Sequence, residues 1–245
     1  RFWPTVAVIT AFKLTRSSVM EEKHYHFILF DLDGTLVDSV PDLAYCVDIA
    51  MQAVGLPPRG VDAVRCWVGN GIEKLMQRAV SGTMDEQPDE RLFTPAYQAF
   101  LAAYKAHNAK RSTVYEGVIP ALDWLTANGY KLACVTNKAE AFTLPLLAEK
   151  GLSHYFSVVV SGDTCAHKKP QPAPLLFALD KLGGTPSQAL MIGDSKSDIH
   201  AARAAGCAVF ALPYGYNHGE DIQLYHPDRV LDSLAELPAI VAPGQ

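Results

Sequence analysis

Residues 27–39 read FILFDLDGTLVDS, in which four apolar residues run directly into two carboxylates at spacing i, i+2 and then a Gly-Thr turn. Four consecutive apolar residues before a turn predict a short strand that is buried on both faces, as in a parallel sheet. Asp31 and Asp33 follow the carboxyl end of this strand, which is where open parallel α/β sheets bind ligands. Because side chains at i and i+2 of an extended segment point to one side, we expect both acids to face one pocket.

The two residues after the acids also favour a site. Gly34 permits a sharp backbone turn, and Thr35 offers a hydroxyl at the start of the next segment. A calcium loop is an alternative interpretation of the D-x-D-G pattern. An EF-hand loop needs further oxygen ligands and a Glu at its last position, whereas Leu36 and Val37 interrupt that pattern here.

The composition is that of an ordinary globular protein and limits its partners. The chain has 245 residues, 49% of them hydrophobic, and a net charge of -5, so it can bury a substantial core. No cluster of Lys and Arg in it is longer than Lys168-Lys169. Because binding to a phosphate backbone needs a basic face, we expect no nucleic acid partner. An anionic substrate must therefore be held by a local group of residues.

The cysteines indicate a reducing compartment. They are odd in number, scattered and without a C-x-x-C pair, which is typical of free thiols and favours a cytoplasmic location. The five cysteines are Cys46, Cys66, Cys134, Cys165 and Cys207. We also expect no association with a membrane, and a protein that is a monomer or a homodimer.

The first nineteen residues do not fit the rest of the chain. Residues 2–12 are mostly apolar but far fewer than the roughly 20 residues that a membrane helix needs, and no small-residue cleavage pattern follows. Met20 resembles a natural start. We interpret residues 1–19 as a disordered or artefactual leader outside the fold, with a weak secretory signal as the alternative.

A helical insert follows the first strand. Pro41 opens a helix that Gly55 ends, and helical spacing recurs over residues 61–68, 72–80 and 89–107. No strand-like run appears between Leu36 and Val114, although a strand-helix-strand crossover needs only about 30 residues. We therefore expect residues 38–116 to form an all-helical cap.

Strands and helices alternate after Gly117, which predicts right-handed crossovers and a parallel sheet covered on both faces. Residues 20–37 and 117–245 would then form an α/β core around this sheet. The expected strands are residues 131–135, 156–160, 189–192 and 208–212, and the expected helices are residues 121–127, 138–150, 174–182 and 198–205.

The strand ends carry a set of side chains suited to phosphoryl transfer. Asp31 and Asp194 are oxygen ligands of the kind that Mg²⁺ prefers. Asp31 can also attack phosphorus, while Mg²⁺ and Lys169 offset the repulsion between the carboxylate and the phosphate. Thr136 donates a hydrogen bond to a phosphate oxygen. Asp33 gives a proton to the departing alkoxide and takes one from the hydrolytic water.

The motifs DLDGT, VTN, KKP and GDSKSD, in this order, resemble the haloacid dehalogenase superfamily of Mg²⁺ phosphohydrolases. The resemblance covers residues 26–242 and implies a Rossmann-like core with a helical cap inserted after the first strand. It implies that Asp31 is the nucleophile and a metal ligand, and that Asp33 is the acid/base with its backbone carbonyl on the metal. The remaining implied roles are phosphate binding by Thr136, Asn137 and Lys169, metal binding by Asp194, and outer support by Asp198.

Three further segments resemble the bacterial phosphoglycolate phosphatase subfamily. They read WVGNG at residues 67–71, YGYNHG at 214–219 and VPDLA at 40–44; plain turns are the alternative for the two glycine-rich segments. The resemblance implies a small anionic phosphate monoester, 2-phosphoglycolate, as substrate. Glycines let the backbone approach a ligand closely, so Gly69, Asn70 and Gly71 are expected to select the substrate.

Two other functions use similar residues. A phosphatase or mutase of the same superfamily would act on a sugar phosphate, and only cap residues decide between these substrates. A phospho-accepting signalling domain also places carboxylates, Mg²⁺, a Thr and a Lys at strand ends. Asp33 argues against the signalling domain, because a switch whose acyl phosphate must persist gains nothing from an adjacent acid/base.

Overall fold

The computed structural model describes residues 25–242 and contains a six-stranded sheet in which every pairing is parallel. The strand order is β5-β4-β1-β6-β7-β8. The Rossmann-like parallel sheet expected from the sequence is therefore confirmed. The strands are β1 Phe27–Phe30, β4 Lys131–Val135, β5 Val158–Val160, β6 Ala189–Gly193, β7 Ala208–Ala211 and β8 Arg229–Val230.

Strand β1 is apolar at every position because both faces of the sheet are covered. Ile28 and Phe30 belong to the core cluster that includes residues of α5, α6 and α9. Phe27 and Leu29 belong to the cluster on the other face, with α7 and α8. The alternation of side chains along a strand thus serves two cores at once. The helices are α5 Val118–Ala127, α6 Glu140–Glu149, α7 Ala173–Leu182, α8 Lys196–Ala205 and α9 Leu237–Val241, and the 3-10 turns are η1 Ser153–Tyr155, η2 Pro186–Gln188, η3 Ile222–Tyr225 and η4 Leu234–Glu236.

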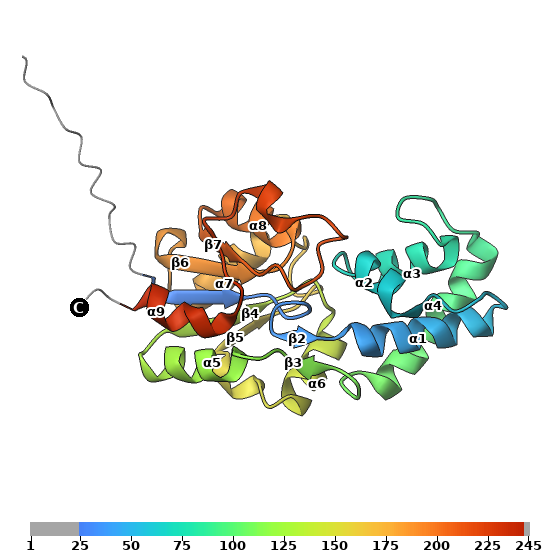
Figure 1. Cartoon of the computed structure of the whole chain (residues 1–245), viewed down its shortest axis with the longest axis horizontal. Coiled ribbons are helices and arrows are strands. Elements are labelled where there is room, and N and C mark those ends of the chain that lie inside the picture. The colour runs from blue at the N-terminus through green and yellow to red at the C-terminus, as the bar shows by residue number, and fades with distance from the viewer. Residues whose placement is uncertain (1–24, 243–245) are drawn as a thin grey trace, which may run out of the picture.

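Four helices follow the first two strands in the chain and lie together beside the core, on the right of Figure 1. They pack around a separate cluster of buried side chains that includes Met51, Met76 and Phe100. The division of the chain into a core and a cap at residues 38 and 116 stays a prediction, and residues 1–19 lie outside the described residues. The four helices are α1 Val40–Ala53, α2 Gly60–Trp67, α3 Ile72–Ser81 and α4 Glu90–His107.

A two-stranded ribbon joins the helical insert to the core. Strands β2 (Val37–Asp38) and β3 (Thr113–Val114) pair antiparallel, so the expectation of no strand after Leu36 is wrong at this point. Two residues are too few to show the alternation of a strand in the sequence, and each of these strands forms only by pairing with the other, which is distant in the chain. Asp42 of α1 braces it, because this buried carboxylate accepts hydrogen bonds from the Arg111 and Ser112 amides, each at 2.8 Å.

None of the helices within residues 25–242 combines the length and the apolar character that crossing a membrane would require.

Candidate active site

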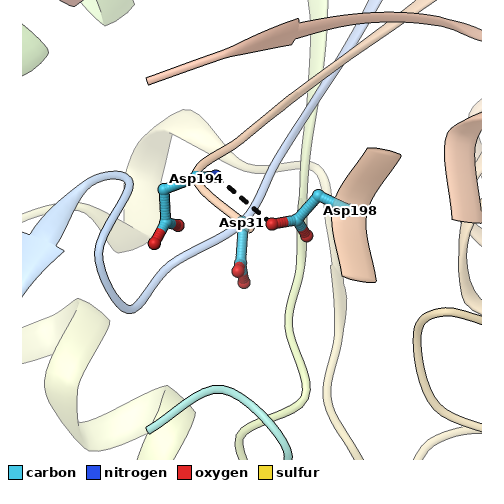
Figure 2. Close-up of side chains that lie close together, drawn as sticks. All are labelled: Asp31, Asp194 and Asp198. Carbon is cyan, nitrogen blue, oxygen red and sulfur yellow. Dashed lines mark hydrogen bonds between the residues drawn. The ribbon is translucent and has the colours of Figure 1, made fainter. Parts of the chain in front are cut away.

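The site lies where neighbouring strands end at one edge of the sheet. Phe30 of β1 is in register with Ile192 of β6 and with Cys134 of β4, so the residues that follow each strand emerge at the same level. Figure 2 shows Asp31, Asp194 and Asp198 converging at this edge. Asp31, Asp33 and Thr136 also line one cavity, as expected from the sequence.

Three carboxylates form a group that could hold a metal ion. One oxygen from each of Asp31, Asp194 and Asp198 lies within 4.8 Å of the others. Burial raises the pKa of Asp31 to about 7, with Asp198 adding to the rise and Lys169 opposing it. Burial, followed by the charge of Asp31, also raises the pKa of Asp194 well above its ordinary value. Negative charge is therefore costly here, and a hard divalent cation with oxygen ligands would offset it.

Asp194 is held in place from several sides. Its Oδ1 accepts a hydrogen bond from Thr35 Oγ1 at 2.6 Å, and its Oδ2 accepts one from the Tyr216 amide at 2.6 Å. Two glycines leave room for it, since a Cβ built on either Gly34 or Gly215 would lie 2.2 Å from Asp194 Oδ2. Gly34 also has φ +86°, which L side chains rarely adopt. The DGT turn after β1 therefore makes room for, and hydrogen-bonds to, the Asp194 carboxylate that follows β6.

Lys169 supplies a buried positive charge beside the acids. Its Nζ lies 2.9 Å from Asp31 Oδ1, 2.7 Å from Asp198 Oδ1 and 2.7 Å from the Val135 carbonyl. Burial lowers the pKa of Lys169, but Asp198 and Asp31 outweigh it and raise the pKa above its ordinary value. Lys169 therefore remains cationic at neutral pH.

Asp198 supports the site from behind. Its Oδ2 accepts hydrogen bonds from the Ser195 amide at 3.0 Å, from Ser195 Oγ at 2.7 Å and from the Asp194 amide at 3.2 Å, the last drawn dashed in Figure 2. These bonds cap the start of α8, while the other oxygen pairs with Lys169. The outer support that the family resemblance implies for Asp198 stays a prediction.

Asn137 connects the core to the cap. Its side-chain amide donates to the Gly69 carbonyl at 3.2 Å and to the Lys169 carbonyl at 3.0 Å, and its Oδ1 accepts from the Lys169 amide at 2.9 Å. Both amide hydrogens are therefore committed within the protein. Asn137 lines the cavity together with Thr136, but the phosphate-binding role expected for it would have to use its backbone.

Lys138 is a site residue that the sequence did not reveal. Its Nζ lies 3.0 Å and 3.2 Å from the two carboxylate oxygens of Asp33 and 2.6 Å from the hydroxyl of Tyr104 in α4. Ser39 Oγ donates to Asp33 as well, at 2.5 Å. The helix expected over residues 138–150 begins only at Glu140. The helix expected from the sequence would place the positive charge of Lys138 in its first turn, where it opposes the helix dipole. This unfavourable position was the one sign in the sequence that Lys138 has another role.

The cap closes the cavity with a turn and several apolar side chains. Gly69 and Gly71 line it, whereas Asn70 belongs to the turn but not to the lining. A Cβ on Gly71 would lie 3.2 Å from Lys168 Nζ, so the turn approaches the core closely. The volume open to the centres of water molecules is about 50 Å³, which suits only a few waters. The apolar lining residues are Leu43, Val68, Ile72 and Leu75.

Comparison with known proteins gives consistent matches over most of the chain. Residues 28–212 match the family model described as haloacid dehalogenase-like hydrolase. A protein of Nitrosococcus oceani named phosphoglycolate phosphatase is 52% identical over 220 residues, which are 90% of this chain and 98% of the relative. A protein of the same name from Thiobacillus denitrificans is 42% identical over 214 residues, covering 87% of this chain and 94% of the relative.

Solved structures agree with these relatives. The crystal structure of a predicted phosphoglycolate phosphatase from Haemophilus somnus has a TM-score of 0.83 and 39% identity, covering 88% of this chain and 97% of that chain. CbbY from Rhodobacter sphaeroides, in complex with phosphate, has a TM-score of 0.72 and 24% identity, covering 89% of this chain and 100% of that chain. The second likeness concerns the fold alone.

Proposed function

The chain belongs to the haloacid dehalogenase-like hydrolases, and on this premise we propose that it is a Mg²⁺-dependent phosphatase that hydrolyses 2-phosphoglycolate to glycolate and phosphate. The observation that carries the proposal is the buried group formed by Asp31, Asp194 and Lys169 at the strand ends. The names of the relatives from Nitrosococcus oceani and Thiobacillus denitrificans support the substrate.

The acids fit a magnesium ion. Asp31, Asp194 and the backbone carbonyl of Asp33 would hold it, since Mg²⁺ prefers one or two carboxylates together with water and substrate phosphate. The ion would supply positive charge that offsets the repulsion between the nucleophile and the phosphate. Asp198 takes no direct part in this proposal, because its oxygens accept bonds from Lys169, Ser195 and the Asp194 amide.

Asp31 is the proposed nucleophile. Its Oδ1 accepts a hydrogen bond from the Leu32 amide at 2.7 Å and lies 2.9 Å from Lys169 Nζ. These contacts fix the carboxylate and leave Oδ2 for attack on phosphorus. A bond forms between this oxygen and phosphorus while the bond from phosphorus to the glycolate oxygen breaks, which gives an aspartyl-phosphate. Water then attacks the phosphorus and releases phosphate and the free carboxylate.

Asp33 is the proposed acid and base. It lines the same cavity as Asp31 and is held by Ser39 and Lys138. In the first step it gives its proton to the departing glycolate oxygen, and in the second it takes a proton from the attacking water. One carboxyl group thus serves both half-reactions and ends the cycle in the state in which it began.

The small cavity supports a compact substrate. The cap side offers apolar side chains and the backbone of the turn that contains Gly69, Asn70 and Gly71. A hexose phosphate would need several hydroxyl partners, whereas the side chains that the cap contributes to this lining are apolar. We therefore propose that the turn selects 2-phosphoglycolate over sugar phosphates. A cytoplasmic location is also proposed, supported by five cysteines that are all free thiols; the monomer or homodimer expected from the sequence stays a prediction.

A panel of phosphate monoesters assayed with and without Mg²⁺ tests the proposal. We expect kcat/KM for 2-phosphoglycolate to exceed that for glucose 6-phosphate by at least about tenfold, or roughly 1.4 kcal/mol in transition-state binding. Activity should vanish when a chelator removes the divalent ion and return when Mg²⁺ is added. Equal or faster turnover of glucose 6-phosphate would contradict the substrate, and full activity in the chelator would contradict the metal.

A further inference from the structure

Tyr104 and Lys138 connect a cap helix to the acid/base of the core. We propose that these two residues position the Asp33 carboxyl for proton transfer, so that helix α4 takes part in the acid-base step. The inference rests on the function proposed above for Asp33. Neither residue needs to touch the substrate for this role, and both are therefore positioning residues.

The geometry around Lys138 leaves its ammonium group little freedom. Its three hydrogens match three acceptors, namely the two oxygens of Asp33 at 3.0 Å and 3.2 Å and the hydroxyl of Tyr104 at 2.6 Å. Lys138 is 5% exposed. A buried ammonium group is strongly held by its partners, because losing one leaves a charge without water. Removing the Tyr104 hydroxyl should therefore shift the Lys138 ammonium group relative to Asp33.

Tyr104 is itself fixed between the two parts of the molecule. Its ring is fully buried and lies 5.3 Å, centroid to centroid, from Phe100 in the same helix and 4.7 Å from Phe142 in α6 of the core. The ring therefore cannot turn away without disturbing this packing. A continuous set of contacts runs from the cap through Tyr104 and Lys138 to Asp33.

A further contact to Asp33 comes from the start of the cap. Ser39, the residue before α1, donates its hydroxyl hydrogen to Asp33 Oδ1 at 2.5 Å. Lys138 belongs to the core, but its contact with Tyr104 and the hydrogen bond from Ser39 both link Asp33 to cap residues, whereas Asp31 is held by Leu32 and Lys169 of the core. The acid/base is therefore linked to the cap, and the contacts that fix the nucleophile come from the core.

Leaving-group dependence separates positioning of the acid from general support of the fold. Expulsion of a poor leaving group such as phenolate needs the proton from Asp33, whereas 4-nitrophenolate departs more readily without it. A variant in which Asp33 is misplaced should therefore lose more activity on phenyl phosphate than on 4-nitrophenyl phosphate. A variant that only weakens the fold should lose activity on both equally.

The experiment compares kcat/KM for these two esters in Tyr104→Phe at saturating Mg²⁺, because kcat/KM reports the step that expels the leaving group and excludes the later hydrolysis of the aspartyl-phosphate, which is common to both esters. We expect the ratio of kcat/KM for 4-nitrophenyl phosphate to kcat/KM for phenyl phosphate to rise at least about fivefold, a part of the 10² to 10⁴ that an acid supplies. Tyr97→Phe is the matched control, because it removes a hydroxyl from the same helix and no hydrogen bond of that hydroxyl is found within residues 25–242. Its ratio should match that of the unmodified protein.

A second pair of variants guards against misfolding. Lys138→Met should raise the ratio further than Tyr104→Phe does. Lys138→Arg keeps the charge and should bring the ratio part of the way back to that of the unmodified protein. Thermal melts report whether each variant is folded. An unchanged ratio in both Tyr104→Phe and Lys138→Met would overturn the inference. Neither aryl ester carries a carboxylate, so this test does not depend on whether 2-phosphoglycolate is the substrate. If the proposed phosphatase function were wrong, the unmodified protein would turn over no phosphate monoester at all.

Discussion

Gly215 lies so close to Asp194 that the structure leaves no room for a side chain at this position. A Cβ there would lie 2.2 Å from Asp194 Oδ2, 2.3 Å from its Cβ and 2.4 Å from its Cγ, whereas ordinary contact begins at 3.4 Å. The Gly215 φ does not lie in the left-handed region, so Gly215→Ala adds a methyl group without straining the backbone. The effect of the substitution is therefore a displacement of the Asp194 carboxylate.

The magnitude follows from that displacement. The two groups must separate by about 1 Å to reach ordinary contact, and a shift of this size in a catalytic group costs on the order of 10²-fold in rate. This corresponds to about 2.7 kcal/mol. Because Asp194 is a proposed metal ligand, we expect the loss to appear chiefly as a higher Mg²⁺ concentration for half-maximal activity, with a lower kcat at saturation.

The assay is a Mg²⁺ titration of phosphatase activity, accompanied by calorimetric titration of the protein with Mg²⁺. Pro213→Ala is a suitable control, because Pro213 is exposed in the same loop. A thermal melt shows whether the added methyl group also destabilises the fold, as overpacking commonly does by about 1–3 kcal/mol. Unchanged Mg²⁺ affinity and kcat in a folded Gly215→Ala protein would refute the assignment of Asp194 to the metal.

Three further results are expected. Asp31→Asn should lower turnover by at least on the order of 10³ with the fold intact, since it removes the nucleophile; retention of a tenth of the activity in a steady-state assay would contradict this. Asp42→Ala should lower the free energy of unfolding by at least about 2 kcal/mol and the Tm by about 4–8 °C, because it leaves the Arg111 and Ser112 amides without their acceptor; calorimetry measures both. Burial lowers the pKa of His218 in the folded state below its ordinary 6.5. The contribution of this group to the free energy of unfolding is therefore fully present above pH 6.5 and should be lost as the pH falls from 6.5 through the lowered pKa. Denaturant titrations of the unmodified protein and His218→Gln test this, and an equal loss in both would count against it.

The sequence predicts the catalytic core well because its chemistry follows buried strands. Strand β1 is an unbroken apolar run, since both faces of the sheet are covered, and its carboxyl end is marked by Asp31. The expected strand over residues 131–135 agrees with β4 at both ends. Residues that terminate buried strands stand out against an apolar background, so Thr136 and Asp194 could be identified from local pattern alone.

Features that depend on distant partners could not be predicted in this way. Strand β8 and the β2-β3 ribbon contain two residues per strand, too few for a period to appear. Lys138 looks like an ordinary surface charge until Asp33 and Tyr104 are brought to it by the fold. The use of the Asn137 side chain between Gly69 and Lys169 likewise depends on how the cap lies over the core.

The β2-β3 ribbon brings the two ends of the helical insert together. Because Asp38 lies opposite Thr113, the two ends of the insert meet, and a two-residue turn such as Asn-Gly could join them directly as a hairpin. A chain shortened in this way would retain Asp31, Lys169 and Asp194 but lose Tyr104. Different inserts could be grafted onto the same two strand ends, and each would have to supply its own partners for Asp33 and Lys138, so a new insert would affect the acid-base step as well as the range of substrates.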